Sequence, residues 1–294
     1  LSNGNTISFG PTGFANGTLY LRNFNQAGTT PQSLLIPTGT AGIYFQTGTT
    51  FNGRLDVSSP QLFLNGSTFY GTSSFVKNGA TNNSSNGGNV FHGNVTIRTS
   101  GAGNFILANN SPDNFNANVV FKQNGYGILY PAYNWMNNFR GDISTVGSDT
   151  LITFAAGSGT VNFSGSGPQS FYGDALKSPR VRRMSMNNSS TGLTLNIPIS
   201  IYSSLALING NISTTSTNLL TIENGVSSIS SVSDNSFVNG PMRKIGNQAF
   251  TFPVGKDVRY RPIAMTSPGS NTDQYTAEYF YADPACCTSH DLKV

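Results

Sequence analysis

Four copies of one short motif decide the fold of this chain: FHGNVTI at residues 91–97, FNANVVF at 115–121, FRGDIST at 139–145 and FSG at 163–165. Each copy begins 24 residues after the one before it. The motif starts with Phe, has a small residue two positions later and continues with alternating apolar residues. A fixed interval of this length predicts a β-solenoid, in which each coil of short strands stacks on the next coil.

The alternation within the motif predicts which side chains are buried. Phe91, Val95 and Ile97 fall on one side of the strand, so stacked copies should form inward ladders of Phe and of Val or Ile. Gly93 is expected to permit a tight corner, and His92 is expected to point outward. Looser copies of the motif begin at residues 51 and 69, and another begins out of phase at residue 171.

Composition supports an all-β fold. Asn, Ser, Thr and Gly are abundant and charged residues are only 10% of the chain, so strong helix formers are scarce. The 20 Phe and 12 Tyr supply enough apolar surface to argue against disorder. The formal net charge of +4 is spread thinly, because Arg22 is the only charged residue among the first 53. We therefore expect no nucleic-acid surface. The longest apolar runs fall far short of about 18 residues, so we expect no transmembrane segment either.

The sequence changes character twice toward its C-terminal end. From about residue 185 to 232 a leaner alternation, as in LTLNI at 193–197, predicts further solenoid strands. Near residue 235 the charge rises and prolines mark turns or edges. We therefore predict a solenoid repeat region over residues 1–234. A C-terminal β element of sandwich-like or capping type is predicted over residues 235–294.

The segment DNSFVNGPMRKIGNQAFTFPVGKDVRYRPIAM, at residues 234–265, resembles the C-terminal region of very large repetitive surface proteins of Bacteroidetes-type bacteria. The Phe-Gly units also resemble the repeats of those proteins. The resemblance implies a right-handed parallel solenoid that is exported by the type IX secretion system, serves as an adhesin and has no catalytic residues. It also implies contact with the secretion machinery.

The region richest in candidate ligand-binding side chains lies between residues 126 and 138. It contains the only Trp of the chain, and its aromatic rings beside amides are what a sugar ring stacks on and hydrogen-bonds to. The candidate glycan-binding residues are Tyr130, Tyr133, Trp135 and Asn137. An aromatic stack that merely covers a coil would give the same pattern, and this alternative stays open.

A second candidate site is the only basic cluster, formed by Lys177, Arg180, Arg182 and Arg183. These side chains suit an acidic polysaccharide or a lipopolysaccharide, because each can make charge-assisted hydrogen bonds. The alternative is a set of solvated loop charges at a change of coil geometry.

Two other functions would make different demands on the sequence. A polysaccharide-active β-helix enzyme needs acids that converge, but residues 58–221 contain only Asp113, Asp142, Asp149 and Asp174. An ice-binding solenoid needs a flat rank of Thr, and the 24-residue register matches Thr96 with Val120 and Ser144. No metal or other cofactor is predicted, because the adjacent pair Cys286 and Cys287 with His290 is at best half a zinc site.

The sequence thus predicts a non-enzymatic, secreted or cell-surface structural protein or adhesin. A stiff solenoid stalk would present repeated polar faces to surface polysaccharides or other cell-surface components through weak, multivalent contacts.

Overall fold

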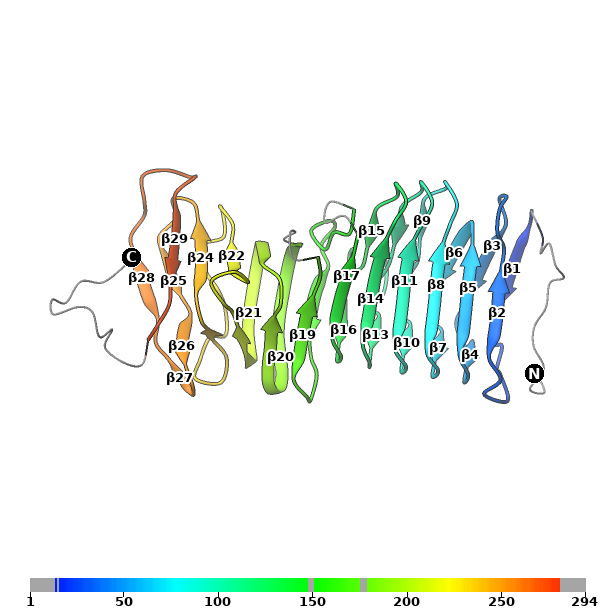
Figure 1. Ribbon diagram of the computed structural model, residues 1–294, viewed down its shortest axis with the longest axis horizontal. Helices are drawn as coiled ribbons and strands as arrows, with labels where there is room; N and C mark the ends of the chain where they lie inside the picture. Colours follow the sequence, from blue (N-terminus) through cyan, green and yellow to red (C-terminus); the bar gives the residue numbers. More distant parts are fainter. Residues whose placement is uncertain (1–13, 15, 148–150, 175–178, 281–294) are drawn as a thin grey trace. The chain divides into compact units, whose positions relative to one another are not determined.

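The computed structural model describes residues 14, 16–147, 151–174 and 179–280 of the 294-residue chain. These residues form strands and no helix. Parallel strands stack as a β-solenoid of about ten turns at intervals of roughly 22 residues, which confirms the predicted all-β solenoid (Figure 1). Within the described ranges no helix is long and apolar enough to cross a membrane.

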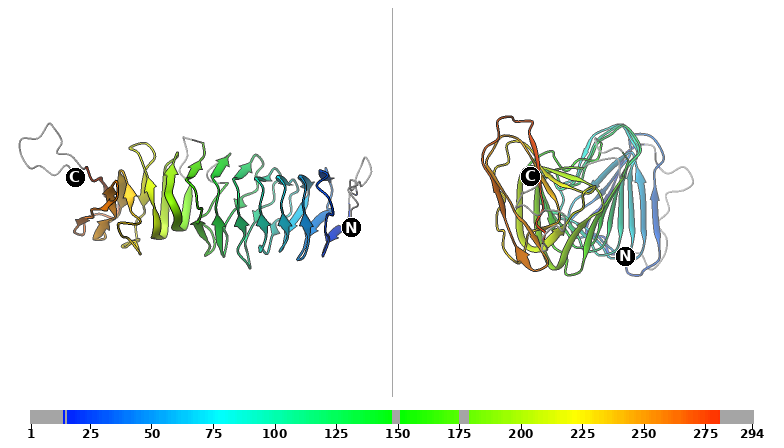
Figure 2. Two further views of the ribbon diagram at one scale, coloured as in Figure 1. Left: turned by 90° about the horizontal axis from the view of Figure 1, so that it is seen from below. Right: turned by 60° about the vertical axis from the view of Figure 1, so that its left-hand side comes forward.

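Contacts divide the chain into two units: residues 1–162 with 172–174, and residues 163–171 with 175–294. In the first unit the coils place their strands in three sets, whose members pair in parallel with the next coil (Figure 2). The first set is β4 (Thr50–Phe51), β7 (Thr68–Phe69), β10 (Val90–Phe91), β13 (Asn114–Phe115) and β16 (Met136–Phe139), and β18 (Thr160–Phe163) follows in sequence. The second set is β2 (Gln32–Leu35), β5 (Leu55–Ser59), β8 (Ser73–Lys77), β11 (Val95–Thr99), β14 (Val119–Gln123) and β17 (Ile143–Val146). The third is β1 (Thr18–Leu21), β3 (Gly42–Phe45), β6 (Gln61–Leu64), β9 (Asn83–Ser84), β12 (Phe105–Ile106) and β15 (Leu129–Tyr130). It forms two three-stranded sheets, because the side chains of Asn83 and Ser85 accept hydrogen bonds from the backbone of β6 and join it to the β9 coil in place of strand pairing.

A ladder of buried phenylalanines runs through the first unit. The rings of Phe91, Phe115 and Phe139 stack with centroids 4.9 Å apart and planes within 7° of parallel. This separation matches the spacing of hydrogen-bonded strands, so each ring lies directly on its equivalent in the next coil. Phe121 packs edge-on against this ladder, 5.9 Å from Phe115. The predicted inward ladder is confirmed.

The 24-residue interval holds in the middle of the first unit and recurs between β1 and β3 and between β19 (Gln169–Tyr172) and β20 (Arg180–Leu195), but not in every coil. In the middle of the first unit β10 pairs with β13 and β13 with β16, which aligns Phe91 with Phe115 and Phe115 with Phe139. The preceding coils are shorter, because Phe91 aligns with Phe69 and Phe69 with Phe51. Strand pairing keeps the core residues in register, while the turns absorb the difference in coil length.

Asparagine ladders link successive coils, one at the turns between strands and one within strands. The side-chain Oδ1 of Asn94 accepts the backbone N–H of Asn118 at 3.2 Å, and Oδ1 of Asn118 accepts that of Asp142 at 2.9 Å. A second ladder joins amide side chains directly, from Asn162 to Asn138 at 2.8 Å and from Asn138 to Asn114 at 2.9 Å. The first ladder satisfies backbone N–H groups at corners that the strand pairing does not reach. The second links side chains within β13, β16 and β18, and both contribute to the abundance of Asn.

The glycine of the motif is required by close approach between coils. A Cβ atom added to Gly93 would lie 2.6 Å from the carbonyl carbon of Gly71 in the preceding coil. Gly93 therefore fits the tight corner as predicted. Only glycine fits there, because the backbones of neighbouring coils come too close for a side chain.

The second unit has longer and less regular strands. Its strand β19 (Gln169–Tyr172) pairs in parallel with β20 (Arg180–Leu195), which pairs with β21 (Ile199–Ser213) through three register shifts. The start of β21 pairs with β22 (Leu220–Ile222) and its end pairs with β23 (Val238–Asn239). The long, bulged strand β21 thus occupies the positions that two short strands, β22 and β23, occupy in the next coil.

Antiparallel pairs enter only at the end of the second unit. Parallel pairing continues from β22 to β24 (Met242–Ile245) and from β23 to β26 (Val254–Lys256). The antiparallel partners are β27 (Arg259–Tyr260) on β26, β28 (Ile263–Met265) on β25 (Phe250–Phe252), and β29 (Gln274–Ala277) on β24. The domain boundary between residues 234 and 235 stays a prediction. Parallel pairing continues past it, as far as Gly255.

Candidate functional site

The aromatic residues of the first candidate site lie on and beside β15 in the first unit. Tyr126 precedes the strand and is 87% exposed, and Trp135 precedes β16 and is 50% exposed. Tyr130 and Tyr133 are half-buried, and their rings meet edge-on with centroids 5.6 Å apart. Burial, and to a smaller extent Tyr133, raises the pKa of the Tyr130 phenol, so this group stays neutral at physiological pH. The segment offers partly exposed, uncharged aromatic surface.

The backbone of this segment is held by the coils on both sides. The backbone N–H of Tyr133 donates to the carbonyl of Leu107 at 3.2 Å, and its carbonyl accepts from Gly159 at 2.7 Å. The carbonyl of Trp135 accepts the N–H of Thr160 at 3.3 Å. The exposed side chains therefore project from an ordered support.

Asn137 is not available to a surface ligand. Its side chain is fully buried, its Oδ1 accepts the N–H of Asp113 at 2.7 Å, and its Nδ2 donates to the carbonyl of Pro131 at 2.6 Å. Both ends of its amide are therefore used inside the fold. Tyr126, which the candidate residues omitted although it belongs to the same run, is the more exposed side chain.

The second candidate site lies on β20 of the second unit. Arg180 and Arg182 are exposed, and Arg183 is half-buried. The guanidinium carbon of Arg180 lies 4.1 Å from the centroid of the Tyr202 ring, which steadies that side chain by a cation–π contact. Lys177 lies outside the described residues, as do Asp149, Cys286, Cys287 and His290.

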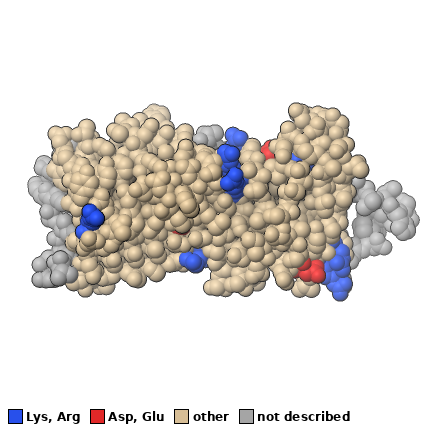
Figure 3. Space-filling view, turned by 180° about the vertical axis from the view of Figure 1, so that it is seen from behind, with Lys and Arg blue, Asp and Glu red and all other residues tan. Residues whose placement is uncertain are grey.

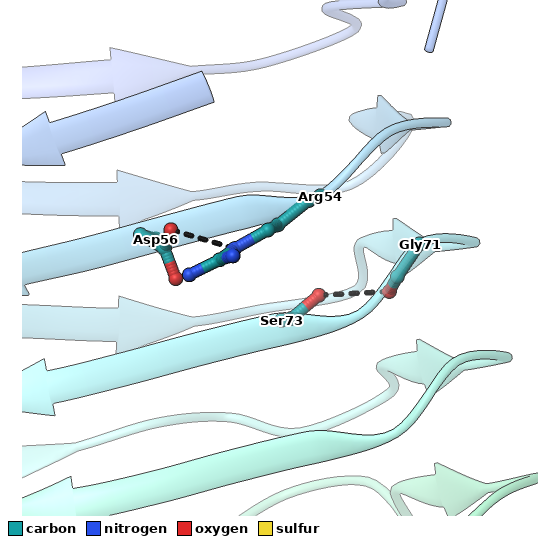
Figure 4. A network of polar contacts seen from close by, with 4 residues as sticks. All are labelled: Arg54, Asp56, Gly71 and Ser73. Atoms are coloured by element: carbon teal, nitrogen blue, oxygen red, sulfur yellow. Dashed lines mark hydrogen bonds and ion pairs between the residues drawn. The ribbon is translucent and has the colours of Figure 1, made fainter. Parts of the chain in front are cut away.

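Charge is sparse elsewhere on the surface. On the face drawn in Figure 3, lysines, arginines and acids form small separate patches among uncharged residues. Arg54 Nε and Asp56 Oδ2 form a solvent-exposed ion pair at 2.9 Å (Figure 4). No group of three His, Cys, Asp or Glu side chains in the described ranges is placed to hold a metal ion.

Asp113 is a buried acid that sequence reasoning left unexplained. Its Oδ1 accepts both the backbone N–H of Asn89 at 2.9 Å and the side-chain Nδ2 of Asn89 at 2.8 Å. Burial raises the pKa of Asp113 from 3.8 to about 7, although the hydrogen bonds from Asn89 act in the opposite direction. Asp113 therefore continues an internal ladder formed by Asn89 and Asn137. Its spacing of 24 residues from both is a signal that could have revealed this role.

Two buried lysines were also missed. Lys77 Nζ donates to the carbonyls of Gly79 at 2.8 Å and Gly103 at 3.1 Å in the first unit. Lys244 Nζ donates to the carbonyls of Glu223 and Ile245 and to Gln248 Oε1 in the second unit. Burial lowers the pKa of both, to about 8 for Lys77. Each ammonium group thus donates hydrogen bonds to backbone carbonyl oxygens at a corner of a coil.

The outward columns of the first unit are mixed in chemistry. His92 points outward as predicted: its ring stacks on Tyr70 at 4.5 Å, and its Nδ1 lies 3.3 Å from Asn116 Nδ2. Arg140 donates to Asn116 Oδ1 in the preceding coil. The column that contains Thr96 otherwise holds Ser33, Asp56, Ser74, Val120 and Ser144, so the paired strands give no rank of Thr there.

Comparison with known proteins adds no assignment. Neither models of known families, nor curated proteins, nor solved structures gave a match to this chain.

Proposed function

We propose that this protein is a non-enzymatic structural protein or adhesin, secreted or displayed at the cell surface, which binds glycans through the aromatic surface of its first unit. The observation that carries the proposal is the exposure of Tyr126 and Trp135 beside the half-buried rings of Tyr130 and Tyr133. Exposed aromatic rings stack on the C–H faces of sugars, and nearby polar groups bond to their hydroxyls.

The stacked coils supply a mechanism for adhesion. Each coil repeats polar outward side chains, as in the column of Tyr70, His92, Asn116 and Arg140. One such contact is weak, but many contacts on one stiff support bind together with a far higher effective affinity. A ligand with a repeating structure, such as a surface polysaccharide, suits this arrangement.

Export is the part of the proposal that depends on the resemblance of residues 234–265 to type IX secreted surface proteins. Expression of the full-length gene product in its native cell, followed by surface proteolysis and fractionation, tests this directly. We expect the protein in the extracellular or surface fraction. Retention inside intact cells would contradict the proposal.

A glycan array tests the aromatic surface. We expect the wild-type chain to bind a subset of glycans and Trp135→Ala to lose at least tenfold of that signal. Tyr172→Ala is the matched control, because Tyr172 is an exposed Tyr outside the segment. Absence of binding by the wild type, or equal binding by all three chains, would contradict glycan recognition at this surface.

The exposed arginines of β20 favour a second ligand class, an acidic polysaccharide. We expect Arg182→Glu to weaken binding to sulfated or uronic-acid glycans, with an effect that shrinks as salt rises. Arg259→Glu serves as the control, since Arg259 is equally exposed on β27. Equal loss in both variants would show nonspecific charge attraction instead.

A further inference from the structure

A cavity of about 340 Å³ opens to the surface of the second unit. It lies between the segment that follows β22 and the antiparallel strands at the end of the chain. The residues that define its chemistry are Ser227, Ser228, Phe250, Thr251, Tyr260 and Met265. This volume falls in the range of pockets that hold small organic ligands.

The lining combines hydroxyl groups with apolar surface. Ser227, Ser228, Thr251 and Tyr260 bring hydroxyl groups to the lining, and none of the ten lining residues is charged. Phe250, Met265, Ile229, Val232 and Pro253 provide the apolar part. A ligand that uses both parts must carry hydroxyls and an apolar face, and it gains nothing from a charge.

The walls of the cavity are held by strand pairing. Phe250 aligns with Met265 across β25 and β28, and Phe250 packs edge-on against Phe252 at 5.0 Å. Tyr260 aligns with Gly255 across β26 and β27, and its N–H donates to Asp234 Oδ1 at 2.8 Å. Preformed walls lower the entropy lost when a ligand binds.

We propose that this cavity binds one or two rings of a neutral saccharide. A sugar ring has hydroxyls at its rim and an apolar C–H face, which match the two kinds of lining. The site shares a ligand class with the Trp135 surface of the first unit, but it uses different residues and does not depend on that surface.

Saturation-transfer difference NMR on the full chain tests the site with glucose, galactose, mannose, N-acetylglucosamine, lactose and maltose as probes. Glucuronic acid provides a charged comparison. We expect at least one neutral sugar to bind with a Kd in the millimolar range, more tightly than glucuronic acid. Ser228→Trp should fill the cavity and weaken that binding at least tenfold.

Two further variants separate loss of the site from loss of the fold. Ser216→Trp places the same side chain at an exposed position outside the cavity, and it should bind as the wild type does. Tyr260→Phe removes only a hydroxyl and should weaken binding several-fold. Circular dichroism verifies that each variant is folded.

The outcomes also distinguish this site from the proposed aromatic surface. Trp135→Ala should leave the binding of these small sugars unchanged. No binding by the wild type to any probe, or binding that survives both Ser228→Trp and Tyr260→Phe, would overturn the cavity site. Loss of binding in Trp135→Ala alone would place the sugar on the first unit instead.

Discussion

The two units use the same solenoid principle with different regularity. In the first unit, short strands repeat so evenly that Phe91, Phe115 and Phe139 stack in nearly parallel planes. In the second, β20 and β21 are long and bulged, and antiparallel strands enter at the end. The one cavity described above lies where this regularity is lost. The comparison teaches that a strict ladder stacks equivalent side chains on one another, whereas the irregular end of the second unit brings side chains from separate segments around a cavity.

Breaking the Phe ladder should have the largest effect. Phe115→Asp buries a charge between two stacked rings with no cation to pair it, so we expect a loss of about 4 kcal/mol or more of unfolding free energy. Urea denaturation followed by circular dichroism measures this loss. Asn94→Asp is the matched control, because Asp142 already occupies the equivalent exposed position two coils later. Similar stability of both variants would refute the ladder.

Removing the buried lysines should have the next largest effect, and it compares the two units directly. Lys77→Met leaves two carbonyl oxygens without a donor, and Lys244→Met leaves three acceptors. We expect each to cost about 2–3 kcal/mol in thermal or urea unfolding, since the lost hydrogen bonds are charged and buried. Lys122→Met, at a half-buried outward position, should cost far less. If Lys77→Met left the unfolding free energy unchanged, water would be replacing the ammonium as the donor to these carbonyl oxygens.

Asp113 should make the first unit sensitive to pH. Its folded pKa of about 7 lies above its ordinary value of 3.8, so the folded state binds the proton more tightly. Stability is therefore highest below about pH 4 and falls as pH rises through 7. We expect Asp113→Asn to raise the unfolding free energy at pH 8 by about 1–2 kcal/mol and to change it little at pH 4.

The measurement for Asp113 is a set of urea titrations between pH 4 and 8. Asn is the appropriate replacement because Asn89 and Asn137 occupy the same ladder, and its Oδ1 still accepts from Asn89. Asp142→Asn provides an acid outside the interior for comparison. The raised pKa of Asp113 would be contradicted if the unfolding free energy of the wild type rose with pH and Asp113→Asn left that pH dependence unchanged.

The smallest effect on stability is expected at the aromatic surface. Trp135→Ala should change the unfolding free energy by no more than about 0.5 kcal/mol, because half of the side chain is exposed. A much larger loss in thermal denaturation would show that Trp135 serves mainly to cover its coil, the alternative that the sequence left open.

The repeat predicted much of the first unit because strand periodicity acts locally. Alternation by two residues assigned Phe91, Val95 and Ile97 to the interior and His92 to the exterior, and the structure agrees. The same rule applies to Asn137, which is two residues before Phe139 and therefore also inward. Its burial was predictable from the alternation, but its amide suggested a ligand contact instead.

Other features depend on residues far apart in sequence. The alignment of Phe51 with Phe69 departs from the 24-residue period, because turns of different length still allow the strands to pair in register. The cavity needs Ser228, Phe250 and Tyr260 to meet from separate segments, and no local pattern encodes that meeting.

The sequence by itself determined the all-β class, the stacking of coils and the inward Phe ladder, since these follow from a fixed repeat and from side-chain alternation along a strand. Only the tertiary structure decided which polar side chains are buried as ladders and where separate segments meet to line a cavity. Those outcomes depend on how neighbouring coils pack, which changes from coil to coil as the turns and strands change length.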